Sequence, residues 1–394
     1  MTQSKPAAEY RAFNALNWHI RFWTFLGLNP IKSQNTFIKS AWFLFSVVLH
    51  FLINIYLPLH LVIGLFDLKH PRDIIENLAN TSNQIITTAK TYVLWKNLGR
   101  IYEIGDISET FERDVKDEKE SFRFILDFRK NSKKYTILFI VVYGLCMTLG
   151  GFSLFVKIQS HRQFFPGYYP FNIDMSEGVF KAVCIYQYVS WTIQGTANIF
   201  FDTYPAILMF LLVQHLRIMN LKISRIGHDL NRTPLENQEI LKEATKHHKI
   251  IMDLFKTISD AVSSTSFALF LVSSLNIVAC IVIISYFSEN MFHKCYYLAL
   301  MICYCMQTAF ISYYGSEFEA EIHQTTTSLY FCNWYEQTRI FKKDFLIFME
   351  NSLKKYSFSA GYVMPINKNT YLGVLKSTYS IYALLNGFKD KLNN

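Results

Sequence analysis

The chain has 394 residues, of which 51% are hydrophobic and 16% aromatic, and its formal net charge is +9. This apolar share is too high for an ordinary soluble domain, so part of the apolar surface must face lipid. The Lys and Arg residues are spread over the segments between apolar blocks and mixed with Asp and Glu, which indicates a cytosolic membrane face and argues against a nucleic-acid partner.

Seven apolar blocks are long enough to cross a lipid bilayer as helices, each of which needs ~20 residues. They lie near residues 40–66, 74–95, 135–156, 178–201, 264–287, 295–316 and 369–388. The predicted fold class is therefore all-α, a seven-transmembrane helical membrane protein. The second block has a polar first half that contains Asn77, Asn80 and Gln84, so this helix is expected to face a cavity or a neighbouring helix.

Basic residues predict the orientation of the chain in the bilayer. Most Lys and Arg residues lie in the segments 1–39, 96–134, 217–262 and 317–367. Since basic segments stay on the cytosolic side, the N-terminus is expected to be cytoplasmic. After an odd number of spans the C-terminus is expected outside the cell.

Several apolar stretches continue beyond the predicted membrane spans. The fourth block runs on through Asp202 and Pro205 to Val213. Amphipathic runs precede the fifth span and follow the sixth, with apolar residues at Ile251, Leu254, Phe255, Ile258, Leu329, Trp334, Phe341, Phe345, Phe348 and Met349. They predict a packed helical body below the membrane, and such a body suggests an oligomer.

The last helix is expected to be interrupted. Gly361 and Pro365 break it, and Asn369 or Thr370 is expected to cap a new helix. The predicted organisation is a cytoplasmic N-terminal segment (1–39), a six-helix bundle with cytosolic extensions (40–316), a cytosolic helix of an anchor domain (317–367), a pore-lining membrane half-helix (368–388) and a short extracellular tail (389–394).

Three stretches carry a resemblance to a known family. They are Phe358–Thr370 together with Leu375–Ser380 and Ala383–Leu385, then Phe201–Pro205, and then Tyr330–Trp334, which is expected to open the last cytosolic helix. In their order and spacing the chain resembles the insect odorant receptors over its whole length. The sister gustatory receptors end in Thr-Tyr, an apolar run and Gln-Phe; Thr378-Tyr379 is present here but Gln-Phe is not, which favours the odorant branch.

The resemblance implies a function for the whole chain. It implies a tuning subunit of a tetrameric, non-selective cation channel that a small volatile ligand opens directly. It also implies assembly with the shared odorant receptor co-receptor in the plasma membrane of olfactory sensory neurons, with the last half-helix lining a central pore and the anchor domain joining the subunits.

The ligand site implied by the resemblance is a mostly apolar cavity in the outer half of the bundle. At that depth the helices carry residues at spacings of three, four or seven, which share one helical face. The candidate ligand-binding residues are Thr81, Gln84, Ile85, Met147, Gly150, Leu154, Tyr188, Trp191, Tyr297, Met301 and Tyr304. The alternative interpretation of these positions is ordinary packing between helices.

The candidate pore residues are Thr378, Tyr382 and Leu385, on one face of the last half-helix, with Asn386 beside them. Large apolar side chains there would stop ion flow by dewetting until ligand spreads the helices. The alternative is that this face packs on the bundle. Lys376 would oppose cation flow in a pore, so it is expected to turn towards an acidic or carbonyl partner.

Other polar residues were assigned structural roles. Asp202 is expected to pair with a basic residue or a helix end, and His247 and His248 are expected on a solvated surface without a metal. No nucleophile–base pattern or phosphate-binding loop is present in the sequence, so neither an enzyme nor a cofactor is expected. The alternative functions are a G-protein-coupled-type chemoreceptor, a gustatory receptor channel and a transporter.

Overall fold

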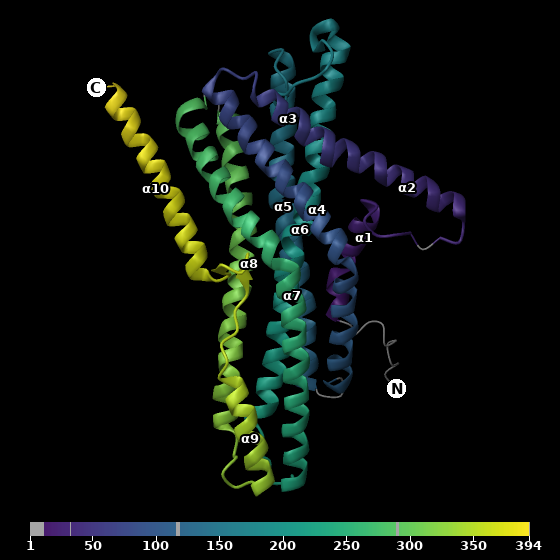
Figure 1. Cartoon of the computed structure of the whole chain (residues 1–394), viewed down its shortest axis with the longest axis vertical. Coiled ribbons are helices and arrows are strands. Elements are labelled where there is room, and N and C mark those ends of the chain that lie inside the picture. The colour runs from purple at the N-terminus through teal and green to yellow at the C-terminus, as the bar shows by residue number, and fades with distance from the viewer. Residues whose placement is uncertain (1–11, 32, 116–118, 289–290, 394) are drawn as a thin grey trace.

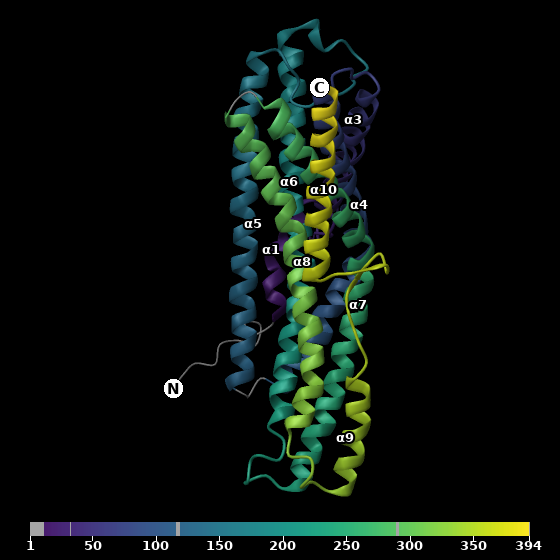
Figure 2. The ribbon, with the colours of Figure 1, turned by 90° about the vertical axis from the view of Figure 1, so that its left-hand side faces the viewer.

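Most of the long helices run side by side along the length of the molecule, as Figures 1 and 2 show. The structure is a computed structural model; it describes residues 12–31, 33–115, 119–288 and 291–393, but not the side chains of residues 114–121 and 385–393. The all-α class predicted from the sequence is confirmed. In chain order the elements are η2 (Ala12–Leu16), α1 (Asn17–Phe25), α2 (Thr36–His50), η3 (Phe51–Tyr56), α3 (Leu57–Leu65), α4 (Pro71–Val115), α5 (Lys119–Gln159), η4 (Ile173–Met175), α6 (Glu177–Ser224), α7 (Pro234–Val282), η5 (Ile283–Phe287), α8 (Met291–Phe331), α9 (Arg339–Ser352), β1 (Ser359–Ala360), β2 (Met364–Pro365) and α10 (Lys368–Asn393).

In the described part of the chain, five helical stretches are long and apolar enough to cross a membrane. They are Thr36–Leu65, Phe122–Gln159, Glu177–Ser224, Pro234–Phe287 and Met291–Phe331. They coincide with the first, third, fourth, fifth and sixth predicted spans. Over their described residues α4 and α10, at the second and seventh predicted spans, are more polar.

The polar residues of α4 face inwards, as the sequence predicted. Asn77 and Gln84 are fully buried and Asn80 is nearly so. Asn77 accepts a hydrogen bond from Thr81 at 2.7 Å, and Ser82 donates one to Asn276 of α7 at 2.9 Å. A helix of this composition is therefore held by polar contacts with its neighbours rather than by contact with lipid.

Helix α6 is the central element of the bundle. It contacts α5, α7 and α8, and almost every residue from Ala197 to Leu216 is buried. A helix that is apolar on all sides must be enclosed by protein or lipid, and here the enclosing layer is the other helices. The excess length of the fourth apolar block is thus explained by burial within the chain.

The buried apolar residues form two clusters. The lower core includes residues 197–226 of α6 and the segment after it, 241–270 of α7, 311–329 of α8 and 341–348 of α9, and it reaches to the lower end of the molecule in Figure 1. The upper core lies towards the connection between α5 and α6, at the other end. It consists of Leu61, Phe139, Tyr143, Cys146, Phe164, Phe165, Trp191, Ile199, Phe200, Ile277, Cys280, Ile283, Tyr296, Tyr297, Ala299, Cys303 and Tyr304.

The lower core confirms the burial of the predicted amphipathic faces but corrects the prediction for two histidines. Ile251, Leu254, Phe341 and other apolar residues of these runs are buried. His247 and His248, expected on a solvated surface, are 0% and 8% exposed. His247 packs on Phe111 of α4 and His248 on Phe348 of α9, because α7 is covered on that side by both helices. Burial lowers the pKa of His248 to about 4.

A short hairpin joins α9 to α10. Strands β1 and β2 pair antiparallel, and Gly361 and Tyr362 between them both have positive φ. The hairpin docks on α7, where Gly361 N donates to Ser263 O at 2.9 Å. The predicted helix break is therefore confirmed.

Two details of the chain around the predicted break differ from expectation. The cap of α10 is Asn367, whose Oδ1 accepts a hydrogen bond from Thr370 N at 3.0 Å, rather than Asn369 or Thr370. The Tyr330–Trp334 stretch does not open a helix, because α8 ends at Phe331 and α9 begins only at Arg339.

Candidate functional site

The upper core is a cluster of aromatic rings contributed by several helices. Trp191 of α6 lies 6.1 Å from Tyr188 and 6.2 Å from Tyr296 of α8, measured between ring centroids. Tyr296 and Tyr297 are edge-to-face at 5.0 Å. An assembly of this kind offers dispersion contacts and a few hydroxyl groups, which is what a small, mostly apolar ligand needs.

Most of the candidate ligand-binding residues come together in this cluster. Trp191, Tyr297 and Tyr304 belong to the upper core, and four more residues pack against it: Met147, Leu154, Tyr188 and Met301. Gly150 is buried beside Trp191, because a Cβ atom added there would lie 2.8 Å from Trp191 Cζ3. Helices α5, α6 and α8 thus bring these candidates together around one aromatic cluster, and their role in ligand binding stays a prediction.

The three candidates on α4 are placed differently from one another. Thr81 and Gln84 are buried, whereas Ile85 is 51% exposed and points away from the bundle. Both amide atoms of Gln84 are buried without a hydrogen-bond partner among the described residues, as are Asn276 Nδ2 and Tyr296 Oη. A buried polar atom left unpaired costs about 1–3 kcal/mol, so water or a ligand with complementary polar groups would be stabilised beside these side chains.

A buried polar network ties the helices together next to the upper core. Lys90 of α4 pairs with Asp202 of α6 at 2.5 Å, and Tyr143 of α5 donates to the other carboxylate oxygen of Asp202 at 2.9 Å. Gln307 of α8 donates to Tyr143 Oη at 2.6 Å and accepts from Ser273 of α7 at 3.3 Å. The prediction that Asp202 pairs with a basic residue is confirmed.

Sequence reasoning did not find the other members of this network. Lys90 lies near the end of the second predicted span and is only 5% exposed, so it is a buried cation within a weakly apolar segment. That position was a usable signal, because a charge at membrane depth requires a partner. Tyr143 and Gln307 gave no such signal, since either residue type also occurs in an ordinary helix interface.

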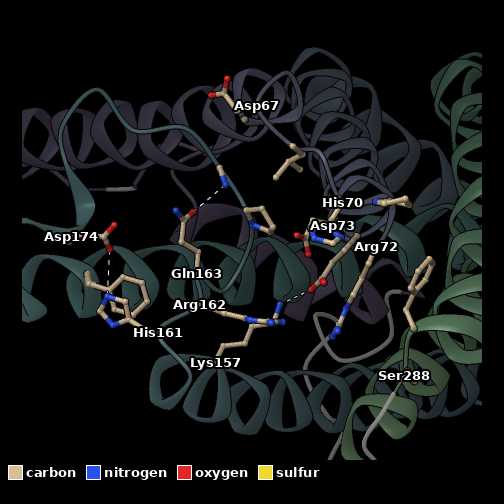
Figure 3. A pocket seen from close by; sticks show the side chains of 18 of the residues that line it. Asp67, His70, Arg72, Asp73, Lys157, His161, Arg162, Gln163, Asp174 and Ser288 are labelled. Carbon is tan, nitrogen blue, oxygen red and sulfur yellow. Dashed lines mark hydrogen bonds and ion pairs between the residues drawn. The ribbon is translucent and has the colours of Figure 1, made fainter.

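Within the described part of the chain, cavities also lie outside the upper core. The vestibule, a polar cavity of about 720 Å³ at the upper end, is formed by the start of α4, the end of α5, the segment before α6 and residues near η5 (Figure 3). In it Lys157 reaches the Glu76 carboxylate at 2.5 Å. A second cavity of about 680 Å³, lined by Trp42, Tyr92, Trp95 and others, lies between α2 and α4. Neither cavity was expected from the sequence.

Helix α10 rests on α7 and α8 and leans away from the bundle towards its upper end (Figure 1). Thr378 is 2% exposed and donates a hydrogen bond to Val374 O of the preceding turn, and Tyr382 Oη lies 3.5 Å from Ser285 Oγ of η5. The predicted pore face thus contacts its own bundle at these two residues. The side chains of Leu385 and Asn386 lie outside the described residues.

Several apolar side chains of α10 outside these two contacts are exposed, and they lie on different sides of the helix. Leu372, Tyr379, Ile381 and Leu384 are all more than 40% exposed. Lys376 is exposed too, and among the described side chains no acidic partner is seen for it. In the single chain it therefore turns away from the bundle rather than towards an acid within it.

The comparison with protein families decides the identity of the chain. The profile described as 7tm Odorant receptor matches residues 70–379. The chain belongs to the odorant receptor family. Odorant receptor 33b of Drosophila melanogaster is 24% identical over 363 residues, covering 92% of this receptor and 94% of the relative. Odorant receptor 33a of the same organism is 22% identical over 384 residues, covering 96% and 99%.

The fold of this odorant receptor is also that of a solved insect receptor. The olfactory receptor OR5 of Machilis hrabei, in complex with eugenol, superposes with a TM-score of 0.78 at 14% sequence identity, covering 96% of this receptor and 99% of OR5. A second structure of OR5 superposes with a TM-score of 0.76 at 13% sequence identity. At this identity the likeness establishes the shared fold.

Proposed function

We propose that this odorant receptor is a subunit of a ligand-gated, non-selective cation channel formed with the odorant receptor co-receptor. A small volatile ligand binds in the upper core, on the outer side of the membrane, and the last helix lines the pore. The chain lies in the plasma membrane of olfactory sensory neurons with its N-terminus in the cytoplasm. The family relationship and the aromatic upper core support this proposal.

Helix α8 contributes residues to the proposed ligand site and also contacts the start of α10. This observation is the main support for the proposal. Tyr297 and Tyr304 of α8 belong to the upper core, and Gln307 of the same helix belongs to the buried network. Further along α8, Ser316 Oγ accepts a hydrogen bond from Lys368 N, the first residue of α10, at 2.8 Å. A ligand that displaces α8 therefore displaces the start of α10.

The contact between α8 and the start of α10 is close and charged. A Cβ atom at Gly315 would overlap the carbonyl oxygen of Ile366, so the two backbones touch there. Glu317 pairs with Lys368 at 3.4 Å and with Arg217 of α6 at 2.9 Å. Glu317 thereby links α6 to α10. A shift of α8 would therefore act on both of these helices.

The ligand class follows from the chemistry of the upper core. Stacked aromatic rings and few polar atoms favour a small aromatic or terpenoid molecule with one or two hydrogen-bonding groups. The structurally similar OR5 of Machilis hrabei was solved in complex with eugenol, an aromatic phenol. Eugenol, volatile esters and terpenoids are therefore the first ligands to test.

Electrical recording from cells that express this receptor with the co-receptor tests the proposal. We expect ligand-evoked current that reverses near zero in mixed Na⁺ and K⁺ and that persists when G-protein signalling is blocked. Current abolished by the block would instead indicate a G-protein-coupled receptor. An N-terminal epitope tag that stains on intact cells would contradict the proposed orientation.

A further inference from the structure

The segment of residues 164–167, called here the wall segment, separates the vestibule from the upper core. Its inner side is aromatic: Phe164 and Phe165 are each 1% exposed, and the Phe164 ring lies 5.6 Å from Tyr188 and 5.9 Å from Trp191. Its other side faces the polar vestibule, because Pro166 and Gly167 belong to the lining of that cavity. A single stretch of chain therefore forms the roof of the aromatic cluster and the floor of the vestibule.

Side chains of neighbouring helices hold the wall segment in place. Gln187 of α6 donates to Phe165 O at 2.8 Å and accepts from Phe165 N at 3.0 Å, so its amide pairs with both backbone polar groups of that residue. Asn77 of α4 donates to Pro166 O. Since these partners come from helices that also flank the upper core, the wall segment is fixed across its outer side.

Lys157 holds the wall segment from the side of the vestibule. Its Nζ donates to Phe164 O at 2.8 Å and pairs with Glu76 Oε1 at 2.5 Å. The two side chains are only 16% and 6% exposed, yet both line the vestibule. Figure 3 shows Lys157 among the charged side chains that line the vestibule. Because this ion pair is shielded from water, removing one of its charges strongly destabilises the contact.

We propose that the vestibule is the route by which ligand reaches the upper core, and that the Lys157–Glu76 pair latches the wall segment across this route. The inference rests on the proposed function, because it assumes that the upper core binds the ligand. A polar, charge-lined route selects neutral ligands that carry an oxygen-bearing group, such as phenols, alcohols and esters. Pure hydrocarbons would lose their lipid surroundings there and gain no polar contact.

Breaking the latch tests the proposal through the speed of the response. Glu76→Gln keeps the side-chain shape and removes one charge, and Lys157→Met keeps most of the side-chain length and removes the other. We expect the onset and the washout of ligand-evoked current both to become about tenfold faster, because ligand crosses the same lowered barrier when it enters and when it leaves. The half-maximal concentration should change much less than the rates. Lys181→Met is the matched control, because it breaks an exposed pair with Glu177 at the same end of the molecule.

The same measurement of onset and washout rates can also contradict the latch. Rates in Lys157→Met and Glu76→Gln equal to those in Lys181→Met would overturn the latch, provided that surface labelling shows equal amounts of each receptor. If the unmodified receptor gave no ligand-evoked current at all, that result would instead contradict the proposed function. The two failures are therefore distinguishable.

Blocking the vestibule tests the route without weakening the fold. A Cys295→Ser background removes the exposed native cysteine, and Asp174→Cys then places a thiol at an exposed position in the vestibule lining. Labelling it with a bulky, membrane-impermeant methanethiosulfonate reagent should slow current onset several-fold. Glu177→Cys, exposed outside that lining, is the control. Unchanged onset after complete labelling of Asp174→Cys would show that ligand arrives by another path.

Discussion

Substitution of Asp202 by Asn should destabilise the receptor by isolating a buried charge. The side chains of Lys90 and Asp202 are 5% and 0% exposed, so water cannot replace the lost carboxylate. Breaking a buried ion pair costs about 3–5 kcal/mol, whereas breaking an exposed pair costs less than ~1 kcal/mol. Thermal stability of the detergent-solubilised receptor, followed by size-exclusion chromatography, should fall by several degrees.

A second substitution distinguishes charge isolation from simple loss of contacts. Lys90→Met combined with Asp202→Asn removes both charges, so the double variant should recover most of the lost stability, with a coupling of about 2 kcal/mol or more. Arg113→Gln, which breaks an exposed pair with Glu109, is the surface control. Additive losses in the double variant, or an Asp202→Asn effect no larger than the surface control, would refute the reasoning.

Three further substitutions probe the ligand site and the pore helix. Gly150→Ala forces Trp191 to move, so half-maximal concentrations should rise more for large ligands than for small ones; an equal rise for all would contradict a pocket beside this tryptophan. Gly315→Ala presses on Ile366 O and should alter current without ligand while the order of ligand potency stays the same. Basal current equal to that of the unmodified receptor would argue against this seat for α10. Tyr382→Ala should change gating or ion selectivity, and a reordered ligand preference would contradict its assignment to the pore helix.

The helical spans were predictable because their signal is local. A block of ~20 apolar residues needs no knowledge of its neighbours to be recognised as a membrane helix. The continuation of the fourth block to Val213 was readable for the same reason, since its surplus length had to be enclosed by protein. Asp202 was also readable, because a charge at the end of an apolar block requires a partner.

The residues that the sequence did not reveal depend on contacts between distant segments. His247 and His248 stand among lysines and glutamates, so their local pattern is that of a surface, and only the packing of α4 and α9 buries them. Phe164 and Phe165 lie in an irregular segment with no period to indicate a buried face. Their inward turn depends on Gln187, which is more than twenty residues away.

Helix α8 is unbroken from Met291 to Phe331, so its part near the upper core and its part near the start of α10 must rotate together. Tyr297 and Ser316 are separated by roughly 28 Å along the axis and face directions about 100° apart around it, at 1.5 Å and 100° per residue. A rigid rod transmits rotation undiminished. Any rotation imposed at Tyr297 therefore reaches Ser316 with the same angle, but it acts on a different side of the helix.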